Sequence, residues 1–417
     1  MDMQSIRDCC EAAKEASRRT ALLDTETKRN VLRLCARKLI LHTEDILSAN
    51  RRDCDLAEDA GMSGGLLDRL SLSEARIAAM AEGLHAVAAL PDPVGRELER
   101  IVRPNGLVIR KTAVPFGVIG IIYEARPNVT SDAFGLCFMA GSACVLKGGS
   151  AAAASNAAIM DAIHEGLLEA GIEKEAAVLI RQTDRESTTE LMRMNGLIDV
   201  LIPRGSAALI RSVVEHATVP VIETGSGNCH VYADETADTD MAVRIILNAK
   251  TQRVGVCNAC ESVLIHEKKA PELIPLIAAG LETYGVQVFA DDAARAIWPK
   301  WSKATEEDWG REYLDYKLSL KLVKDIDTAI SHINRYNTGH SETIVTSDPV
   351  NAARFQQEVD AACVYVNAST RFTDGGEFGF GAEIGISTQK LHARGPMGLR
   401  ELCSYKYMID GTGQIRP

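Results

Sequence analysis

The chain has 417 residues, with 46 Lys and Arg against 57 Asp and Glu, which gives a net charge of −11 at pH 7. This acidity argues against binding to nucleic acid or to an anionic membrane through bulk electrostatics, although a small anion could still be held locally. The 46% hydrophobic and 25% charged residues exclude a disordered or fibrous chain. The length predicts two or three domains, and no apolar stretch reaches the roughly 20 residues of a membrane helix. Because the first residues lack a signal-peptide pattern, we expect a cytoplasmic protein.

The first ninety residues carry apolar side chains at helical spacing and predict helices that end at the Pro-rich segment 90–95. The next segment predicts a β-hairpin within 99–112, because apolar residues at 101–102 and 107–109 flank a turn at 104–106. Both arms of the hairpin carry charged residues. The hairpin could therefore stand out from its domain as an assembly arm.

From residue 114 onward, short apolar runs alternate with Ala-rich helical patterns, which is typical of parallel α/β sheets. The runs form two series, one before and one after about residue 225. The first series covers 118–122, 143–146, 178–180, 200–202 and 219–222, and the second covers 263–265, 286–289, 320–323, 344–346 and 364–366. The alternation predicts a parallel α/β organisation in both parts of the chain.

Eleven cysteines are spread along the chain, and an odd number without a secretory signal does not indicate a disulfide framework. Cys257 and Cys260 form a C-x-x-C pair with three interpretations. A redox dithiol would need a thioredoxin-like unit, and a zinc site would need a second cysteine pair, which the sequence lacks. We therefore predict no metal site. The third interpretation is a nucleophilic Cys257, since Gly255 allows a tight turn that presents the thiol and its amide N–H to one carbonyl group.

Two strand ends carry groups suited to an anion, and a long Gly-rich loop follows the last predicted strand. The first strand end carries a lysine followed by small residues, and the second leads into the start of a helix. Either arrangement would let a phosphate group approach backbone N–H groups, and a solvated turn is the alternative interpretation. In the loop, an arginine and hydroxyl groups suit a small anionic substrate, with an ordinary surface loop as the alternative. The candidates are Lys147, Gly148, Gly149 and Ser150 at the first strand end, Gly205 and Ser206 at the second, and Ser369, Thr370 and Arg371 in the loop.

Taken in order, these features resemble the aldehyde dehydrogenase superfamily. The shared features are Pro115-x-Gly117, Lys147, Gly205-Ser206, Glu223-x-Gly225, Cys257 and the loop from Asn367. Within that superfamily the chain is similar, over nearly its whole length, to the family of γ-glutamyl phosphate reductases. The stretches that carry this similarity are 123–128, 202–206, 329–333, 340–342 and 384–398. Asn337 departs from the small residue that the family more often has there.

The resemblance implies an α/β, aldehyde-dehydrogenase-like fold with two parallel-sheet α/β domains and a β-hairpin oligomerisation arm. It implies an NADP-binding domain over 1–225, interrupted by the hairpin 99–112, and a catalytic cysteine domain over 226–380. Residues 381–417 would form a return segment and the C-terminal part of the arm. The arm implies a homo-oligomer, at least a dimer, formed by strand exchange.

The reaction implied is the reduction of L-glutamyl 5-phosphate by NADPH to L-glutamate 5-semialdehyde and phosphate, in L-proline biosynthesis. Cys257 would form a thioester, and its amide N–H would hold the oxyanion together with Arg126 or Asn128. Glu223 aligns with the general base of oxidising relatives, and its role in this direction is open. An oxidising aldehyde dehydrogenase that uses water is one alternative, and a binding or redox module is another. A functional coupling to glutamate 5-kinase is also expected.

The resemblance also implies the cofactor. NAD-preferring relatives carry a glutamate three residues after the strand-end lysine, whereas this chain has Ser150. A hydroxyl removes the repulsion against a 2′-phosphate while Lys147 attracts it, so we predict NADPH over NADH. We expect Glu312 to contact the nicotinamide ribose of the cofactor. The other expected cofactor contacts are Lys147, Gly148, Gly149, Ser150, Gly205, Ser206 and Gly225, with Gly205 and Ser206 near the pyrophosphate.

Overall fold

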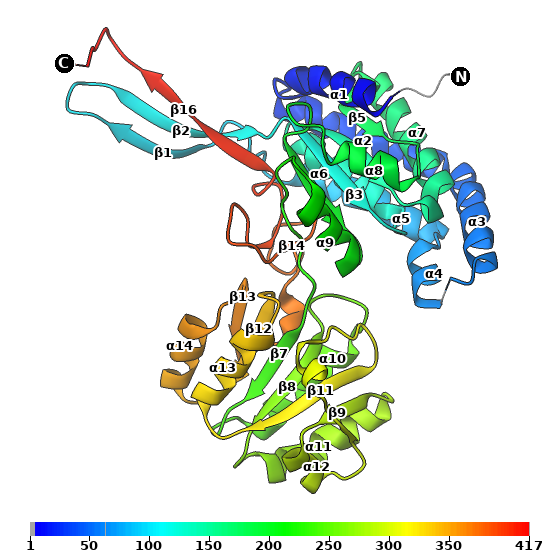
Figure 1. Ribbon diagram of the computed structural model, residues 1–417. Coiled ribbons are helices and arrows are strands. Elements are labelled where there is room, and N and C mark those ends of the chain that lie inside the picture. The colour runs from blue at the N-terminus through cyan, green and yellow to red at the C-terminus, as the bar shows by residue number, and fades with distance from the viewer. Residues whose placement is uncertain (1–4, 63, 417) are drawn as a thin grey trace. The chain divides into compact units, whose positions relative to one another are not determined.

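The computed structural model describes residues 5–62 and 64–416, which form two compact units (Figure 1). Unit 1 comprises the residues up to 223, 379–385 and those from 397 onward; unit 2 comprises 224–378 and 386–396. The expected domain bounds 1–225, 226–380 and 381–417 stay a prediction, and the structure groups 386–396 with 224–378. That segment belongs to unit 2 because the Gly225 N–H donates to the Ile386 carbonyl (2.9 Å) and Arg394 pairs with Asp360 (2.7 Å).

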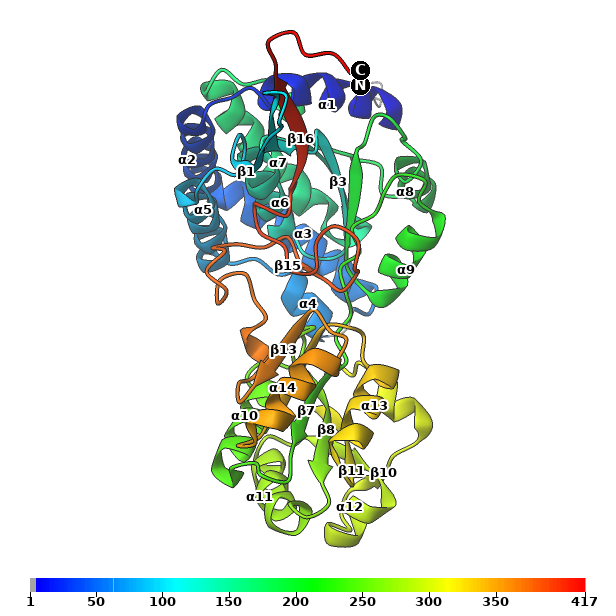
Figure 2. The same ribbon diagram turned by 90° about the vertical axis from the view of Figure 1, so that its left-hand side faces the viewer.

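Unit 1 contains a four-stranded parallel sheet with the order β5-β4-β3-β6. Every residue of β3 and β4 is buried, as expected for a parallel sheet covered by helices on both faces (Figure 2). The strands are β3 (Val118–Tyr123), β4 (Ala143–Gly148), β5 (Ala177–Leu179) and β6 (Val200–Arg204). The helices are α1 (Ile6–Thr20), α2 (Thr25–Leu41), α3 (Thr43–Asp59), α4 (Gly64–Leu70), α5 (Glu74–Ala89), α6 (Asn128–Met139), α7 (Ala153–Glu169), α8 (Arg185–Leu191) and α9 (Ala207–His216).

The predicted strand at 219–222 is wrong. Only Val221 forms a bridge, parallel to Leu201 of β6. The Leu201 N–H donates to the Pro220 carbonyl (2.8 Å), and the Ile222 N–H donates to the Leu201 carbonyl (2.9 Å). Pro220 itself has no N–H to donate, so the pairing does not extend into a ladder.

The predicted hairpin is confirmed and is joined by a third strand. β1 (Glu97–Val102) and β2 (Val108–Pro115) pair antiparallel, and β16 (Cys403–Asp410) pairs with the other edge of β2. Gly106 in the turn has a φ of 89°, a conformation that favours glycine. This three-stranded arm projects away from the helices of unit 1 (Figure 1).

Unit 2 contains a seven-stranded parallel sheet with the order β10-β9-β11-β8-β7-β12-β13. The strands are β7 (Cys229–Ala233), β8 (Cys260–His266), β9 (Gln287–Ala290), β10 (Ser302–Lys303), β11 (Lys317–Val323), β12 (Ser341–Val345) and β13 (Cys363–Val366). The helices are α10 (Thr239–Thr251), α11 (Ala270–Thr283), α12 (Asp292–Ile297), α13 (Ile326–Tyr336) and α14 (Pro349–Glu358), and a short hairpin joins β14 (Ile386–Ser387) to β15 (Gly395–Pro396). Within the described ranges, no helix is both long and apolar enough to cross a membrane.

Candidate functional site

A cavity of about 620 Å³ in unit 1 lies where β3, β4 and β6 end. In open parallel sheets, ligands bind outside the carboxyl ends of the strands, so this is the expected position for a cofactor. The lining includes the predicted residues Lys147, Gly148, Gly149, Ser150 and Ser206. The sequence thus identified the two strand ends that meet at one cavity.

Lys147 is the last side chain of β4 before the glycines and is only 3% exposed. Among the described residues, its ammonium group has no hydrogen-bond or ion-pair partner. Burial lowers the pKa of this ammonium group, and Asp184, which also lines the cavity, counteracts that effect. A buried, unpartnered cation at a cavity wall is stabilised when an anion binds there.

Of the two glycines after Lys147, Gly148 is the one that close packing requires. A Cβ atom at Gly148 would lie 2.1 Å from the Nδ2 atom of Asn156. At Gly149 it would contact the backbone of Glu124 at 3.5 Å. Gly148 thus packs against α7, and Gly149 lies in ordinary contact with the loop after β3.

Gly205 and Ser206 precede α9 as predicted, but the start of this helix already holds an anion. The Glu124 carboxylate accepts hydrogen bonds from the Ser206 N–H (2.7 Å) and from the Ser206 hydroxyl (3.1 Å). A Cβ atom at Gly205 would lie 2.6 Å from Glu124 Oε2. Sequence reasoning missed Glu124 because its binding to α9 depends on the neighbouring position of β3 and β6.

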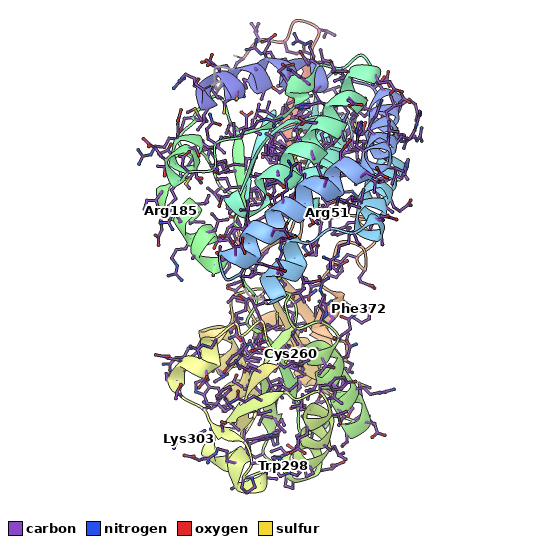
Figure 3. All side chains as sticks on the ribbon, turned by 90° about the vertical axis from the view of Figure 1, so that its right-hand side faces the viewer. Arg51, Arg185, Cys260, Trp298, Lys303 and Phe372 are labelled. Atoms are coloured by element: carbon purple, nitrogen blue, oxygen red, sulfur yellow. The ribbon has the colours of Figure 1, made fainter. Side chains whose placement is uncertain are left out.

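Sequence reasoning also missed Arg185 at the first position of α8. This arginine is exposed and lines the same cavity (Figure 3). In the described part of the chain its guanidinium has no hydrogen-bond or ion-pair partner. The cavity therefore has two cations, Lys147 and Arg185, available to a phosphate group.

The predicted oxyanion side chains lie in unit 1, on the loop after β3 and at the start of α6. Asn128 is exposed, and its side-chain amide donates one hydrogen bond to Asp132 (2.9 Å). Arg126 is half-buried on the loop before α6. Glu223 is half-buried as well and stands at the end of the first segment of unit 1.

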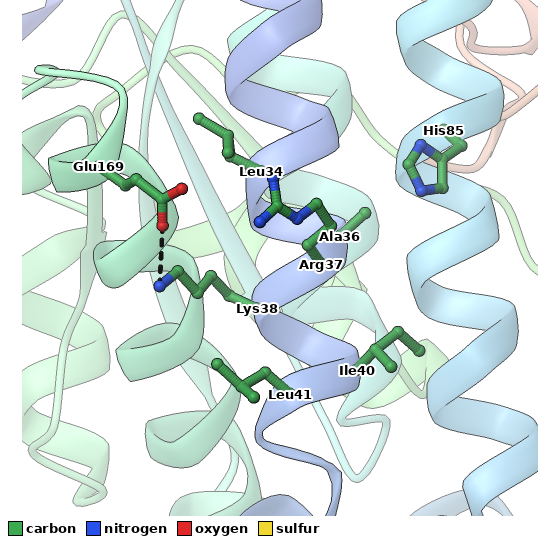
Figure 4. A pocket seen from close by; sticks show the side chains of 8 residues that line it. All are labelled: Leu34, Ala36, Arg37, Lys38, Ile40, Leu41, His85 and Glu169. Atoms are coloured by element: carbon green, nitrogen blue, oxygen red, sulfur yellow. Dashed lines mark ion pairs between the residues drawn. The ribbon is translucent and has the colours of Figure 1, made fainter.

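A second cavity of unit 1 has a different character (Figure 4). Its volume is about 380 Å³, and its wall includes Leu34, Ile40 and Leu41. Its Lys38 ammonium is already paired with the Glu169 carboxylate at 2.9 Å. This mainly apolar hollow therefore lacks the buried, unpartnered cation that distinguishes the cavity at the strand ends.

In unit 2, Cys257 lies half-buried in the loop between α10 and β8. The Cys229 thiol donates to its backbone carbonyl at 3.2 Å. Gly227 packs so closely that a Cβ atom there would lie 1.4 Å from the same carbonyl oxygen. The Gly227 N–H in turn donates to the Glu312 carboxylate (2.7 Å). Gly227 and Cys229 were not identified from the sequence. Glu312, predicted to contact the nicotinamide ribose, accepts this hydrogen bond from Gly227, which packs against the Cys257 carbonyl.

Cys260 differs sharply from Cys257. It is fully buried in β8, where its thiol donates to the Ser262 carbonyl (3.3 Å), and burial raises its pKa to about 12 (Figure 3). All eleven cysteines are free. The described residues contain no group of three or more His, Cys, Asp or Glu side chains placed to hold a metal ion.

The predicted substrate loop holds Asn258, the residue that follows Cys257. Thr370 is fully buried, and its hydroxyl donates to the Asn258 carbonyl (2.7 Å). The Asn258 amide donates to the Thr373 carbonyl (2.8 Å). Ser369 caps the short turn by accepting from the Arg371 N–H (3.3 Å). The hydroxyl hydrogen of Thr370 is thus engaged by the Asn258 carbonyl. Arg371 is the charged member of the predicted set.

Arg371 is half-buried and donates from Nε to the Gln252 side chain (2.7 Å). Burial and the like charge of Arg253 lower the pKa of its guanidinium, whereas Cys257 raises it. The Arg371 guanidinium and the Cys257 side chain therefore interact electrostatically. The loop between α10 and β8 can therefore supply a thiol, and the loop from Asn367 a cation for an anionic substrate.

Comparisons with known proteins show what the chain is similar to. The sequence profile of the aldehyde dehydrogenase family matches residues 1–304 and 318–407. The chain is 56% identical over 404 residues to a gamma-glutamyl phosphate reductase of Caldanaerobacter subterraneus, which covers 97% of this chain and 98% of the relative. It is 55% identical to that of Agathobacter rectalis over 417 residues, covering 99% and 100%.

A solved structure is similarly close. The crystal structure of gamma-glutamyl phosphate reductase from Thermotoga maritima has a TM-score of 0.97 and 47% identity, and it covers 99% of this chain and 100% of that one. The yeast counterpart from Saccharomyces cerevisiae is 28% identical with a TM-score of 0.56. The predicted two-sheet α/β fold with its arm is confirmed by these observations. The chain belongs to the aldehyde dehydrogenase family.

Proposed function

We propose that the chain reduces L-glutamyl 5-phosphate to L-glutamate 5-semialdehyde and phosphate with NADPH, in L-proline biosynthesis in the cytoplasm. The observation that carries this proposal is the 56% identity, over nearly the full length of both chains, to a gamma-glutamyl phosphate reductase. Family membership implies a nicotinamide cofactor. The geometry of both units suits the chemistry required.

In this proposal the Cys257 thiolate attacks the acyl carbon of the substrate. A C–S bond forms, the bond to the phosphate oxygen breaks, and phosphate leaves with the bonding electrons. NADPH, when bound, supplies the hydride that reduces the resulting thioester. The thiolate of Cys257 is then released as the aldehyde forms. No water-activating base is needed in this direction, so Glu223 has no assigned step.

Hydrogen-bond donors must stabilise the oxyanion that forms during the attack. The Cys257 N–H is one proposed donor, with Arg126 or Asn128 as the second. Asn128 has one amide hydrogen engaged by Asp132, which leaves the other for the substrate. Arg371, with Ser369 beside it, is proposed to bind the carboxylate or phosphate of the substrate, since it supplies positive charge against the overall charge of −11.

NADPH is proposed over NADH because the cavity of unit 1 favours an additional phosphate. Lys147 is an unpartnered buried cation in its wall, Arg185 is a second cation, and Ser150 brings no negative charge. The other proposed contacts of the cofactor are Gly148, Gly149, Gly205, Ser206, Gly225 and Glu312.

Homo-oligomer formation through the arm is also proposed. β16 is an edge strand, and its Tyr405, Tyr407 and Ile409 are 49%, 54% and 58% exposed at alternate positions of one face. Exposed strand edges with apolar side chains pair readily with another chain. A Tyr407→Lys variant should therefore show a smaller mass by light scattering than the wild type; an unchanged mass would contradict this role.

A functional coupling to glutamate 5-kinase is proposed as well, on the family resemblance alone.

The decisive assay runs the reaction backwards, with glutamate 5-semialdehyde, NADP⁺ and phosphate, and follows the formation of NADPH. We expect steady turnover that requires phosphate and is lost in Cys257→Ala. Steady turnover without phosphate would instead identify an oxidising aldehyde dehydrogenase that uses water.

A further inference from the structure

The start of α9 is occupied by a carboxylate from the same chain. Glu124, directly after β3, accepts from both the N–H and the hydroxyl of Ser206. The Ser206 hydroxyl also accepts from the Leu209 N–H (3.3 Å) and caps the helix. The helix dipole further favours a negative charge at this position. Glu124 thus occupies the place where a phosphate group would bind to this helix.

The same cavity has a second, independent feature that indicates an anionic ligand. Lys147 is 97% buried, lines the cavity and has no hydrogen-bond or ion-pair partner among the described residues. Glu124 binds Ser206 and leaves Lys147 unpaired. The cavity therefore has one anion site filled by the protein and one buried cation without a partner.

We propose that Glu124 is an internal competitor of the cofactor: it holds the start of α9 in the free enzyme and is displaced by the pyrophosphate of NADPH. This inference rests on the proposed function, because it assumes that a dinucleotide binds in the cavity of unit 1. Glu124 acts as a positioning residue and takes no part in the chemical step.

The surroundings of Glu124 allow such an exchange. The residue is exposed, so its carboxylate can turn into water with little desolvation cost. Gly205 leaves space over the helix start, where a Cβ atom would lie 2.6 Å from the carboxylate and would obstruct any anion there. When the carboxylate leaves, the Ser206 N–H and hydroxyl become free donors for a phosphate oxygen.

Competition makes Glu124 a residue that weakens cofactor binding. Replacing its charge by a neutral amide removes a charge-assisted hydrogen bond from the free state, and such bonds are about twice as strong as neutral ones. We expect the Kd of NADPH for Glu124→Gln to fall about tenfold, and that for Glu124→Ala to fall at least as much. Removal of a ligand-binding residue would have the opposite effect.

The test measures binding by calorimetry to the full chain with three probes: NADPH, inorganic pyrophosphate and adenosine 2′-monophosphate. Glu124→Gln should tighten the first two about tenfold and change the third by less than about twofold, because the third has no pyrophosphate. Glu215→Gln is the matched control, since it removes the same exposed charge from α9 outside the cavity, and it should change none of the three.

Three results would overturn the inference. Unchanged or weaker NADPH binding by both Glu124 variants would show that Glu124 does not compete. Equal tightening of adenosine 2′-monophosphate would indicate a general charge effect instead of competition at α9. Failure of the wild type to bind NADPH would refute the proposed cofactor as well, whereas the first two results would leave the proposed function intact.

Discussion

The cavity of unit 1 and the cysteine loop of unit 2 prepare their ligand-binding groups in opposite ways. In the cavity, the Lys147 ammonium has no hydrogen-bond or ion-pair partner within the described ranges, and the start of α9 binds the carboxylate of the exposed Glu124. In the loop, hydrogen bonds from Cys229, Thr370 and Asn258 fix the backbone from the Cys257 carbonyl through Asn258. Under the proposed function the cavity would exchange a ligand, whereas the hydrogen bonds of the cysteine loop hold one geometry.

This difference has a chemical reason. A diffusible cofactor must bind and leave in each cycle, so its site benefits from charges that water or a displaceable side chain can satisfy between turnovers. A nucleophile must meet a carbonyl carbon at a fixed distance and angle, and misplacement by about 1 Å can cost about a hundredfold in rate. Changes in the loop should therefore affect kcat most, and changes in the cavity should affect cofactor affinity.

The largest effect is expected from Cys257→Ala. Loss of the nucleophile should lower kcat by at least about a thousandfold, because no other group can form the acyl-enzyme. Steady-state turnover measures this directly. Cys260→Ala is the matched control: its thiol is buried with a pKa of about 12, so its removal should change kcat by less than about threefold. Equal losses in both variants would favour a dithiol mechanism.

Gly227→Ala tests the rigidity of the loop. Its new Cβ atom would lie 1.4 Å from the Cys257 carbonyl oxygen, so the backbone must move and kcat should fall about a hundredfold. The matched control is Gly310→Ala, where the nearest atom is 3.9 Å away, and it should retain nearly normal turnover. Normal kcat in Gly227→Ala would show that the loop does not need this fixed backbone.

Lys147→Met tests the cavity. Removing the only buried cation of its wall in the described part of the chain should raise the Kd of NADPH by about 10–100-fold, the range for a charge-assisted hydrogen bond to phosphate. Binding of adenosine 2′-monophosphate should weaken similarly. Lys147→Arg, which keeps the charge, should lose much less. An unchanged Kd in Lys147→Met would place the 2′-phosphate elsewhere.

Ser150→Glu should have the smallest effect of the four, on cofactor preference. A carboxylate would repel the 2′-phosphate, so the ratio of kcat/KM for NADPH over NADH should fall about tenfold. Ser150→Gln has nearly the same size without the charge and separates repulsion from steric hindrance. Equal ratios for Ser150→Glu and the wild type would remove the electrostatic explanation of cofactor choice.

Much of the fold could be predicted because buried parallel strands have continuous apolar runs, as in β3 and β4, whose residues are all buried. β7 was not predicted, since Cys229–Ala233 has a histidine and a cysteine within a short run. The grouping of 386–396 with unit 2 could not be anticipated, because it depends on hydrogen bonds to residues far away in the sequence.

The sequence suggests candidates where a residue type carries the chemistry by itself, as with Cys257 and Lys147, and their roles stay predictions. Contacts that depend on packing could not be anticipated. Gly227 matters because the Cys257 carbonyl lies against it, and Glu124 matters because β6 ends beside β3. No local pattern in the sequence encodes either contact.

The central claim is that Cys257 carries the acyl group, and rapid mixing of the enzyme with glutamate 5-semialdehyde and NADP⁺ without phosphate tests it most directly. The account predicts a burst of one NADPH per active site that then stops, an acyl group on the Cys257 peptide by mass spectrometry, and resumed turnover when phosphate is added. Continued NADPH formation without phosphate, or a burst that leaves Cys257 unmodified, would contradict it.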